Sequence, residues 1–169
     1  SLQVSGPAEL SARAGRLEIR NELNGSAEGL GTKLVERIAE ALAGNLLDGS
    51  GDINTVIYRD RYLNAPLPAM LLISVIDALK TVLFSRWANP VVEVVSVAVP
   101  DEVNTFQRPN LVYHNWRESS IRDKALIAGF EYCGMSAVVR NVPKSIAAHA
   151  RMLEIGTTDG HKLKIWLDQ

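Results

Sequence analysis

The sequence has little of the chemistry that most readily identifies a function. It has one cysteine, Cys133, so an intramolecular disulfide is excluded, and no cysteine–histidine cluster has the spacing of a zinc site. The net charge is −1 over 169 residues, so nucleic acid or anionic lipid would have to bind a local basic patch. Histidine is also scarce: the three are His114, His149 and His161, and positions 1–113 contain none.

Long apolar runs and targeting signals are missing as well. The most apolar stretch, 67–87, contains Ser74, Asp77, Lys80 and Arg86, whereas a membrane-spanning helix needs roughly 20 mostly apolar residues. We therefore expect a buried core helix there and no transmembrane segment. The N-terminus has neither the basic region nor the apolar core of a secretory signal, and with the single cysteine this favours a cytoplasmic protein.

The length and composition suit one folded domain. Hydrophobic residues make up 47% of the chain and charged residues 22%, which is ordinary for a globular protein. We expect 1–14, with Gly6, Pro7 and many small residues, to be an N-terminal arm or linker, and 15–169 to be a single domain. Because the sequence has no initiator Met and stops abruptly, we expect a fragment of a larger protein.

Hydrophobic periodicity predicts strands that alternate with helices. Leucines or isoleucines recur at every fourth position from Leu30 to Leu46, which indicates an amphipathic helix, and the β-branched run Val91–Val99 is typical of an interior parallel strand. Ile121, Ala125, Ala128 and Tyr132 are the predicted packing face of the last helix. The expected strands are 17–23, 53–58, 91–99, 137–140, 149–155 and 163–167, and the expected helices are 30–46, 66–87 and 119–134.

This order predicts an α/β fold with three layers, α/β/α, around a mostly parallel sheet. The two last strands, joined by a turn at Asp159-Gly160, are expected to form an antiparallel hairpin at the C-terminal edge of that sheet.

Basic residues gather near the C-terminus. His149 and Arg151 share one face of a predicted strand; Arg140 and Lys144 precede them, and Lys164 lies on the following strand. Such a cluster is suited to binding a phosphate. The other interpretation is an edge strand whose charges prevent aggregation.

Asp60 and Arg61 directly follow the predicted strand 53–58. Ligands gather at the carboxyl ends of parallel strands, so both are candidate ligand-binding residues. Asp60 has a second interpretation, as a carboxylate that fixes a loop or a helix start. Cys133 is expected to be a core thiol, and the long loop 100–116 offers aromatic side chains to bases or a partner.

Short motifs carry a family resemblance. Glu28-Gly-Leu-Gly31 opens a helix, Arg59-Asp-Arg-Tyr-Leu63 follows a strand, and His149-Ala-Arg151 precedes the turn at Asp159-Gly160. This order resembles the phospholipase D-like domain, in the divergent form found at the C-terminus of MIT-domain proteins. Asp60-Arg-Tyr-Leu63 also resembles segments near the end of bacterial DEAD/DEAH-type helicases, which implies an accessory domain of a protein that handles nucleic acid.

The resemblance also implies a loss of catalysis. Active members of that family use His-x-Lys followed by four residues and an Asp, usually twice, with histidine attacking phosphorus. Here Arg151 stands at the lysine position and Gly156 at the aspartate position, and the first half of the chain has no histidine. We therefore expect the domain itself not to be an enzyme, whereas the parent protein is expected to be an ATP-dependent helicase.

Three functions follow as hypotheses. The first is a non-catalytic accessory domain that binds nucleic acid or another polyanion beside the other domains of its parent protein. The second is a phosphodiesterase or nuclease that acts as a homodimer, with His149 as nucleophile and Arg151 as phosphate ligand. The third is a protein- or membrane-docking module. None of them requires a cofactor or a metal.

Overall fold

The computed structural model describes residues 2–4, 14–18, 35–36, 51–99, 115–147 and 151–167. The strands are β1 (Leu2–Val4), β2 (Ala14–Glu18), β3 (Ile53–Arg59), β4 (Val92–Val97), β5 (Ala137–Val142), β6 (Met152–Thr157) and β7 (Lys162–Trp166). The helices are α2 (Pro66–Val82), the short 3₁₀ helix η1 (Phe84–Arg86) and α3 (Ser119–Tyr132). Within the expected N-terminal arm 1–14, residues 2–4 therefore form a strand and Ala14 begins another.

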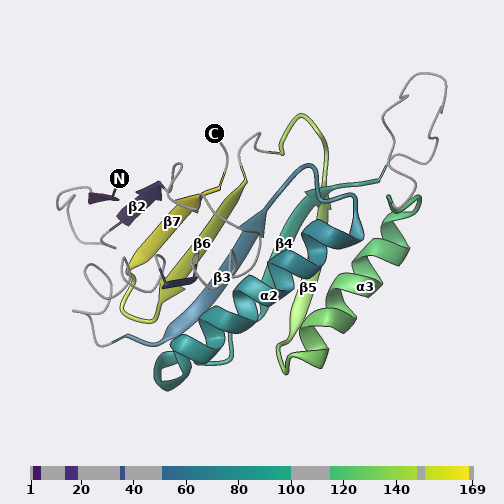
Figure 1. Ribbon diagram of the computed structural model, residues 1–169. Coiled ribbons are helices and arrows are strands. Elements are labelled where there is room, and N and C mark those ends of the chain that lie inside the picture. The colour runs from purple at the N-terminus through teal and green to yellow at the C-terminus, as the bar shows by residue number, and fades with distance from the viewer. Residues whose placement is uncertain are drawn as a thin grey trace.

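The seven strands make one mixed sheet in the order β1-β2-β7-β6-β3-β4-β5 (Figure 1). β3, β4 and β5 are parallel neighbours, and β2 is parallel to β7. The remaining pairs, β1 with β2, β3 with β6 and β6 with β7, are antiparallel. The α/β class is confirmed, but the sheet is mixed rather than mostly parallel.

The C-terminal hairpin is real but does not lie at an edge. β6 pairs with β3 on its other side, and β7 pairs with β2, so the hairpin joins two parts of the sheet. Its turn has Gly160 at φ 86°, a left-handed conformation that glycine adopts without strain. The edges of the sheet are β1 and β5.

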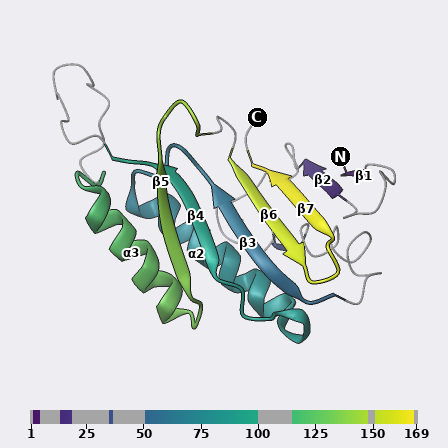
Figure 2. The same cartoon turned by 180° about the vertical axis from the view of Figure 1, so that it is seen from behind.

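The two long helices described, α2 and α3, lie on the same face of the sheet. Figure 2, which turns the molecule by 180°, shows the strands in front of both helices. The described part of the chain thus forms two layers; the third layer of the expected α/β/α arrangement remains a prediction. Only Val35 and Glu36 of the predicted helix 30–46 are described; both are helical, and Val35 belongs to the core.

The core lies between the helices and the sheet face that they cover. Alternation along each strand directs one set of side chains to this face, where Val56, Val94, Leu153, Ile155 and Ile165 are at most 1% exposed. Helix α2, with Pro66 in its first turn, buries four residues there: Ala69, Leu72, Ile76 and Leu79. The opposite side of α2 is more open than its apolar sequence suggested, since Leu67 and Met70 stay well exposed.

Helix α3 buries a different face from the one predicted. Ile121, Ala125, Ala128 and Tyr132 are exposed, and the helix instead packs through Arg122, Leu126 and Phe130. Glu118 occupies the N-cap of this helix without a side-chain bond, and the Ser119 hydroxyl accepts from the Val99 N–H at 2.8 Å. Gly134, at φ 67°, ends the helix as expected.

Most of the expected loop 100–116 lies outside the described residues. Where the structure is described, no helix combines the length and apolar character required to span a membrane.

Candidate functional site

Asp60 lies directly after β3, where the carboxyl ends of the parallel strands β3 and β4 meet. Its backbone is held on both sides: the Asp60 N–H donates to the Val95 carbonyl at 3.0 Å, and the Ser96 hydroxyl donates to the Asp60 carbonyl at 2.7 Å. The residue is only 3% exposed. The chain therefore turns out of the sheet at a fixed, buried acidic position.

The Asp60 carboxylate accepts two hydrogen bonds and forms one ion pair. Oδ1 accepts the Tyr62 N–H at 2.7 Å; Oδ2 accepts the Tyr58 hydroxyl at 3.1 Å and faces Arg151 Nε at 3.3 Å. The predicted site residues Asp60 and Arg151 are thus brought together, although they are far apart in the sequence. A buried carboxylate that fixes its own loop also fixes the Arg151 side chain, which is 43% exposed.

A fully buried arginine, Arg122, lies behind Asp60. Its guanidinium donates to the Val97 carbonyl at 2.8 Å, to the Ser96 hydroxyl at 3.4 Å and to Asn141 Oδ1. Asp123 pairs with it at 2.8 Å and accepts from the Asn141 side-chain amide at 2.7 Å. This network joins α3 to the ends of β4 and β5, and through Ser96 to the Asp60 carbonyl.

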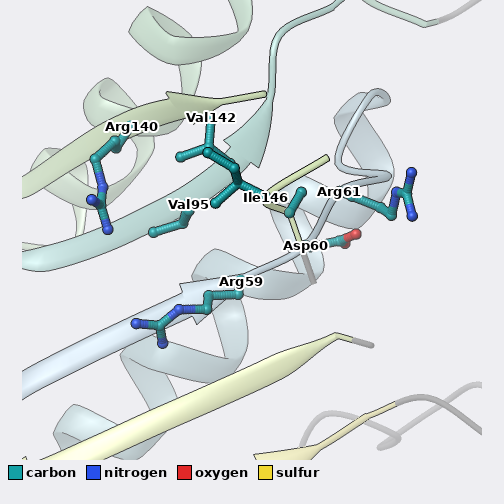
Figure 3. A pocket seen from close by; sticks show the side chains of 8 residues that line it. Arg59, Asp60, Arg61, Val95, Arg140, Val142 and Ile146 are labelled. Atoms are coloured by element: carbon teal, nitrogen blue, oxygen red, sulfur yellow. The ribbon is translucent and has the colours of Figure 1, made fainter. Parts of the chain in front are cut away.

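Two cavities flank Asp60. The first, of about 240 Å³, is lined by Arg59, Asp60, Arg61 and Arg140 with four apolar residues. In Figure 3, Arg59 and Arg140 project from β3 and β5 on either side of Val95, and the Arg61 guanidinium extends away from them. The Arg61 guanidinium carbon lies 5.4 Å from the centre of the Tyr62 ring, a cation–π distance.

The second cavity, of about 330 Å³, is mostly apolar. Tyr58, Asp60 and Arg151 form its polar part, and residues of α2 and of the ends of β6 and β7 form the rest: Leu67, Pro68, Leu71, Leu72, Val75, Leu153, Trp166 and Leu167. Asp60 therefore separates an arginine-lined space from an apolar one.

Basic residues also mark the sheet face that α2 and α3 leave open. Taken strand by strand, basic residues on β5, β3 and β7 alternate with acidic residues on β4 and β6, and most of them are offset along the strands and not directly opposite each other. The basic residues are Arg140, Arg59, Lys162 and Lys164, and the acidic residues are Glu93 and Glu154. We call these six residues the charged face.

The ion pairs on the charged face are close. Arg140 pairs with Glu93 at 2.8 Å, Arg59 with Glu154 at 3.3 Å, and Lys162 with Glu154 at 4.0 Å. The basic side chains are the more exposed partners: Arg140 is 60% exposed against 27% for Glu93, and Lys162 53% against 10% for Glu154. An approaching molecule therefore meets cations first.

The predicted basic cluster is more dispersed than the sequence suggests. Arg140 and Lys164 stand on the same face but four strand spacings apart, roughly 19 Å. Lys144 is exposed in the turn after β5. His149, and with it the proposed nucleophile, lies outside the described residues.

Sequence reasoning missed Arg59 and Arg122. Arg59 has a readable signal, because the alternation along β3 places it on the face opposite the core residues Val56 and Tyr58. Arg122 lies four residues before Leu126 and eight before Phe130, the spacing of a buried helical stripe. The burial of a charged residue in that stripe can be explained only once its partners on β4 and β5 are known.

The described residues were also compared with the requirements of a metal site and of a reactive thiol. They contain no group of three or more histidine, cysteine or acidic side chains that would hold a metal ion. Burial raises the pKa of the Cys133 thiol, with a smaller contribution in the same direction from Asp77, so the thiol remains protonated at neutral pH.

Comparison with known protein families gives a match. A family model described as "DEAD/DEAH box helicase YjiV, C-terminal domain" matches residues 13–169. No curated protein and no solved structure matches the chain significantly.

Proposed function

Because this chain belongs to the family of C-terminal domains of the DEAD/DEAH box helicase YjiV, we propose that it is a non-catalytic accessory domain of such a helicase that binds nucleic acid or another polyanion. The charged face is the proposed contact surface. The observation that carries the proposal is the burial order of its ion pairs, in which each carboxylate lies beneath a more exposed arginine or lysine.

The attraction for a polyanion comes from the charged face and not from the net charge of the whole chain. The charged face has four basic and two acidic side chains, although the whole chain has a net charge of −1. Exposed guanidinium and ammonium groups attract phosphates, and each phosphate they neutralise releases counterions. Arg59 and Arg140 belong both to this face and to the cavity beside Asp60, so a phosphate bound there would lie next to the fixed loop 60–62.

The proposed absence of catalysis has a packing reason. By the resemblance to phospholipase D-like domains, Gly156 stands at the position where active members carry an aspartate. A Cβ atom at Gly156 would lie 3.1 Å from the Thr55 Cβ, closer than side chains normally approach. An aspartate there would require Thr55 to move, so the site favours glycine.

An oligonucleotide titration tests the proposal. The 169-residue chain should bind a fluorescent single strand at low salt, and the affinity should fall with salt by a slope of about −0.7 per phosphate contact. The double variant Arg140→Gln, Lys162→Gln should bind about tenfold more weakly and lose roughly 1.4 from that slope.

Lys124 supplies the matched control. It is an exposed lysine on α3, on the other side of the sheet from the charged face, so Lys124→Gln should leave both the affinity and the slope unchanged. Absence of binding at low salt, or equal binding by the double variant and the original chain, would refute the proposal.

A further inference from the structure

The apolar cavity beside Asp60 has one wall of exposed leucines. Leu67 and Leu71 lie one helical turn apart on α2 and are 65% and 50% exposed, and both line the cavity. The cavity volume of about 330 Å³ lies at the lower end of the range for small-molecule sites, roughly 300–1,000 Å³. Because covering apolar surface removes it from water, a small apolar group would gain free energy by lying against this wall.

The opposite wall comes from the ends of two strands. Trp166 ends β7, Leu167 follows it, and both are half-buried, whereas Leu153 of β6 is 1% exposed. The Leu167 N–H donates to the Arg151 carbonyl at 2.9 Å, which continues the pairing of β6 with β7. This wall therefore belongs to the sheet itself, so the cavity has one rigid side.

One cation and one anion stand at the polar end of the cavity. Among the described residues that line it, Arg151 is the basic one and Asp60 the acidic one. Asp60 is 3% exposed; its Oδ2 lies 3.3 Å from Arg151 Nε and accepts the Tyr58 hydroxyl at 3.1 Å. The Arg151 side chain is 43% exposed. A ligand would therefore meet the guanidinium and not the buried carboxylate.

These charges favour a planar monoanion as the polar group of the ligand. A guanidinium binds a carboxylate through two parallel hydrogen bonds, which fix the orientation of the ligand. A phosphate with two negative charges would lie close to the buried Asp60 carboxylate, where like charges repel more strongly than in water. The apolar lining would also leave the second charge poorly solvated. A carboxylate therefore fits the polar end better than a phosphate does.

We propose that this cavity binds a small amphipathic carboxylate. The carboxylate lies on Arg151, and the apolar body lies between the leucines of α2 and Trp166. The site is on the side of the sheet that α2 covers, whereas the charged face is on the other side. The inference therefore goes beyond the proposed function and does not rest on polyanion binding.

Octanoate is the probe, and nuclear magnetic resonance of the 169-residue chain is the measurement. Titration should shift the Trp166 indole N–H and the Arg151 Nε–H resonances along one saturable curve. Acetate, which lacks the apolar body, and octanol, which lacks the carboxylate, should each bind at least about tenfold more weakly. Inorganic phosphate should shift neither resonance. A shift with octanoate that does not saturate, or equal affinity for octanol or phosphate, would overturn the proposal.

Variants of the cavity wall test the contacts. Leu71→Ser should weaken octanoate binding by about tenfold because the apolar body loses part of its cover, and Arg151→Gln should do the same because the carboxylate loses its partner. Met70→Ser is the matched control. Met70 precedes Leu71 on α2 and is 63% exposed, but it is not among the residues that line the cavity, so the affinity should stay the same. Equal effects of Leu71→Ser and Met70→Ser would contradict the assignment.

The double variant of the charged face separates this site from the proposed function. Arg140→Gln, Lys162→Gln should bind octanoate as the original chain does, and Leu71→Ser should bind the oligonucleotide as the original chain does. Octanoate binding without oligonucleotide binding would refute only the proposed function, and the reverse result would refute only this site. Loss of octanoate binding in the double variant would place the carboxylate on the charged face and overturn the proposal.

Discussion

The two ends of the sheet each hold a hydrogen-bonded aspartate, in very different surroundings. Asp60, at the carboxyl end of β3, is 3% exposed and faces Tyr58, Tyr62 and Arg151. Asp159, in the turn between β6 and β7, is exposed; it accepts the Gly51 N–H at 3.1 Å and the Thr157 hydroxyl. The same chemical group therefore serves a buried network at one end and a solvated turn at the other.

The two aspartates differ in how strongly the fold should depend on their hydrogen bonds. Buried polar groups are expensive to leave without partners, whereas exposed ones exchange their partners for water. The end at Asp60 also has both cavities, the arginines that line them and the Arg122 network, whereas at the other end the turn with Asp159 packs against the Gly51-Asp52 backbone. Breaking each end in turn should therefore give effects of very different size.

The largest effect is expected for Arg122→Ala. This change removes a guanidinium with 0% exposure and leaves Asp123, Asn141 and the Val97 carbonyl without their partner. We expect a loss of about 3–5 kcal/mol in the free energy of unfolding and a melting temperature lower by about 10 °C. Chemical denaturation followed by circular dichroism measures both.

The control for Arg122→Ala is Lys124→Ala. Lys124 lies two residues further along α3 and is exposed, so its loss should change the free energy of unfolding by no more than about 0.5 kcal/mol. If the two variants were equally stable, the buried network would not hold α3 to the strand ends.

Asp60→Asn is expected to have an intermediate effect. The amide can still accept the Tyr62 N–H, but its nitrogen would face two donors, the Tyr58 hydroxyl and Arg151 Nε. Since Arg151 is partly exposed, the loss should be about 1–3 kcal/mol. Asp52→Asn, at an exposed aspartate near the other end, is the matched control, and urea denaturation of both variants should separate them.

Sequence patterns predicted the positions of the helices and strands better than they predicted which strands pair in the sheet. Alternation and β-branched runs located β3, β4 and β7, and the apolar stretch after Pro66 located α2. The predicted edge position of the hairpin was wrong. Local patterning indicates that β6 and β7 pair with each other, but it does not indicate which strands pair with their outer sides. β2 and β3, which flank them, lie far earlier in the chain.

The site residues could be predicted from the sequence only in part, for a related reason. Asp60 was found because a carboxylate after a strand is a local signal, and Arg151 because of its motif. The charge of Arg122 indicates an exposed position, yet four partners on β4, β5 and α3 itself make its burial favourable. The burial of such a residue depends on tertiary contacts, which hydrophobic periodicity does not predict.

The smallest effect is expected for Asp159→Asn, and it should depend on pH. The Thr157 hydroxyl donates a hydrogen bond to the ionised carboxylate, and the Gly51 N–H donates a second. The Thr157 bond has the larger effect, and both hold the pKa of Asp159 below its ordinary value of 3.8. A lowered folded-state pKa means that the ionised form stabilises the fold above that ordinary value and that this contribution disappears as the pH falls through the lowered pKa. The asparagine variant should therefore be slightly less stable than the original chain at neutral pH and equally stable near pH 2. Urea midpoints at several pH values provide the measurement; a difference that stayed constant down to the lowest pH would show that the turn depends on side-chain shape and not on the charge of Asp159.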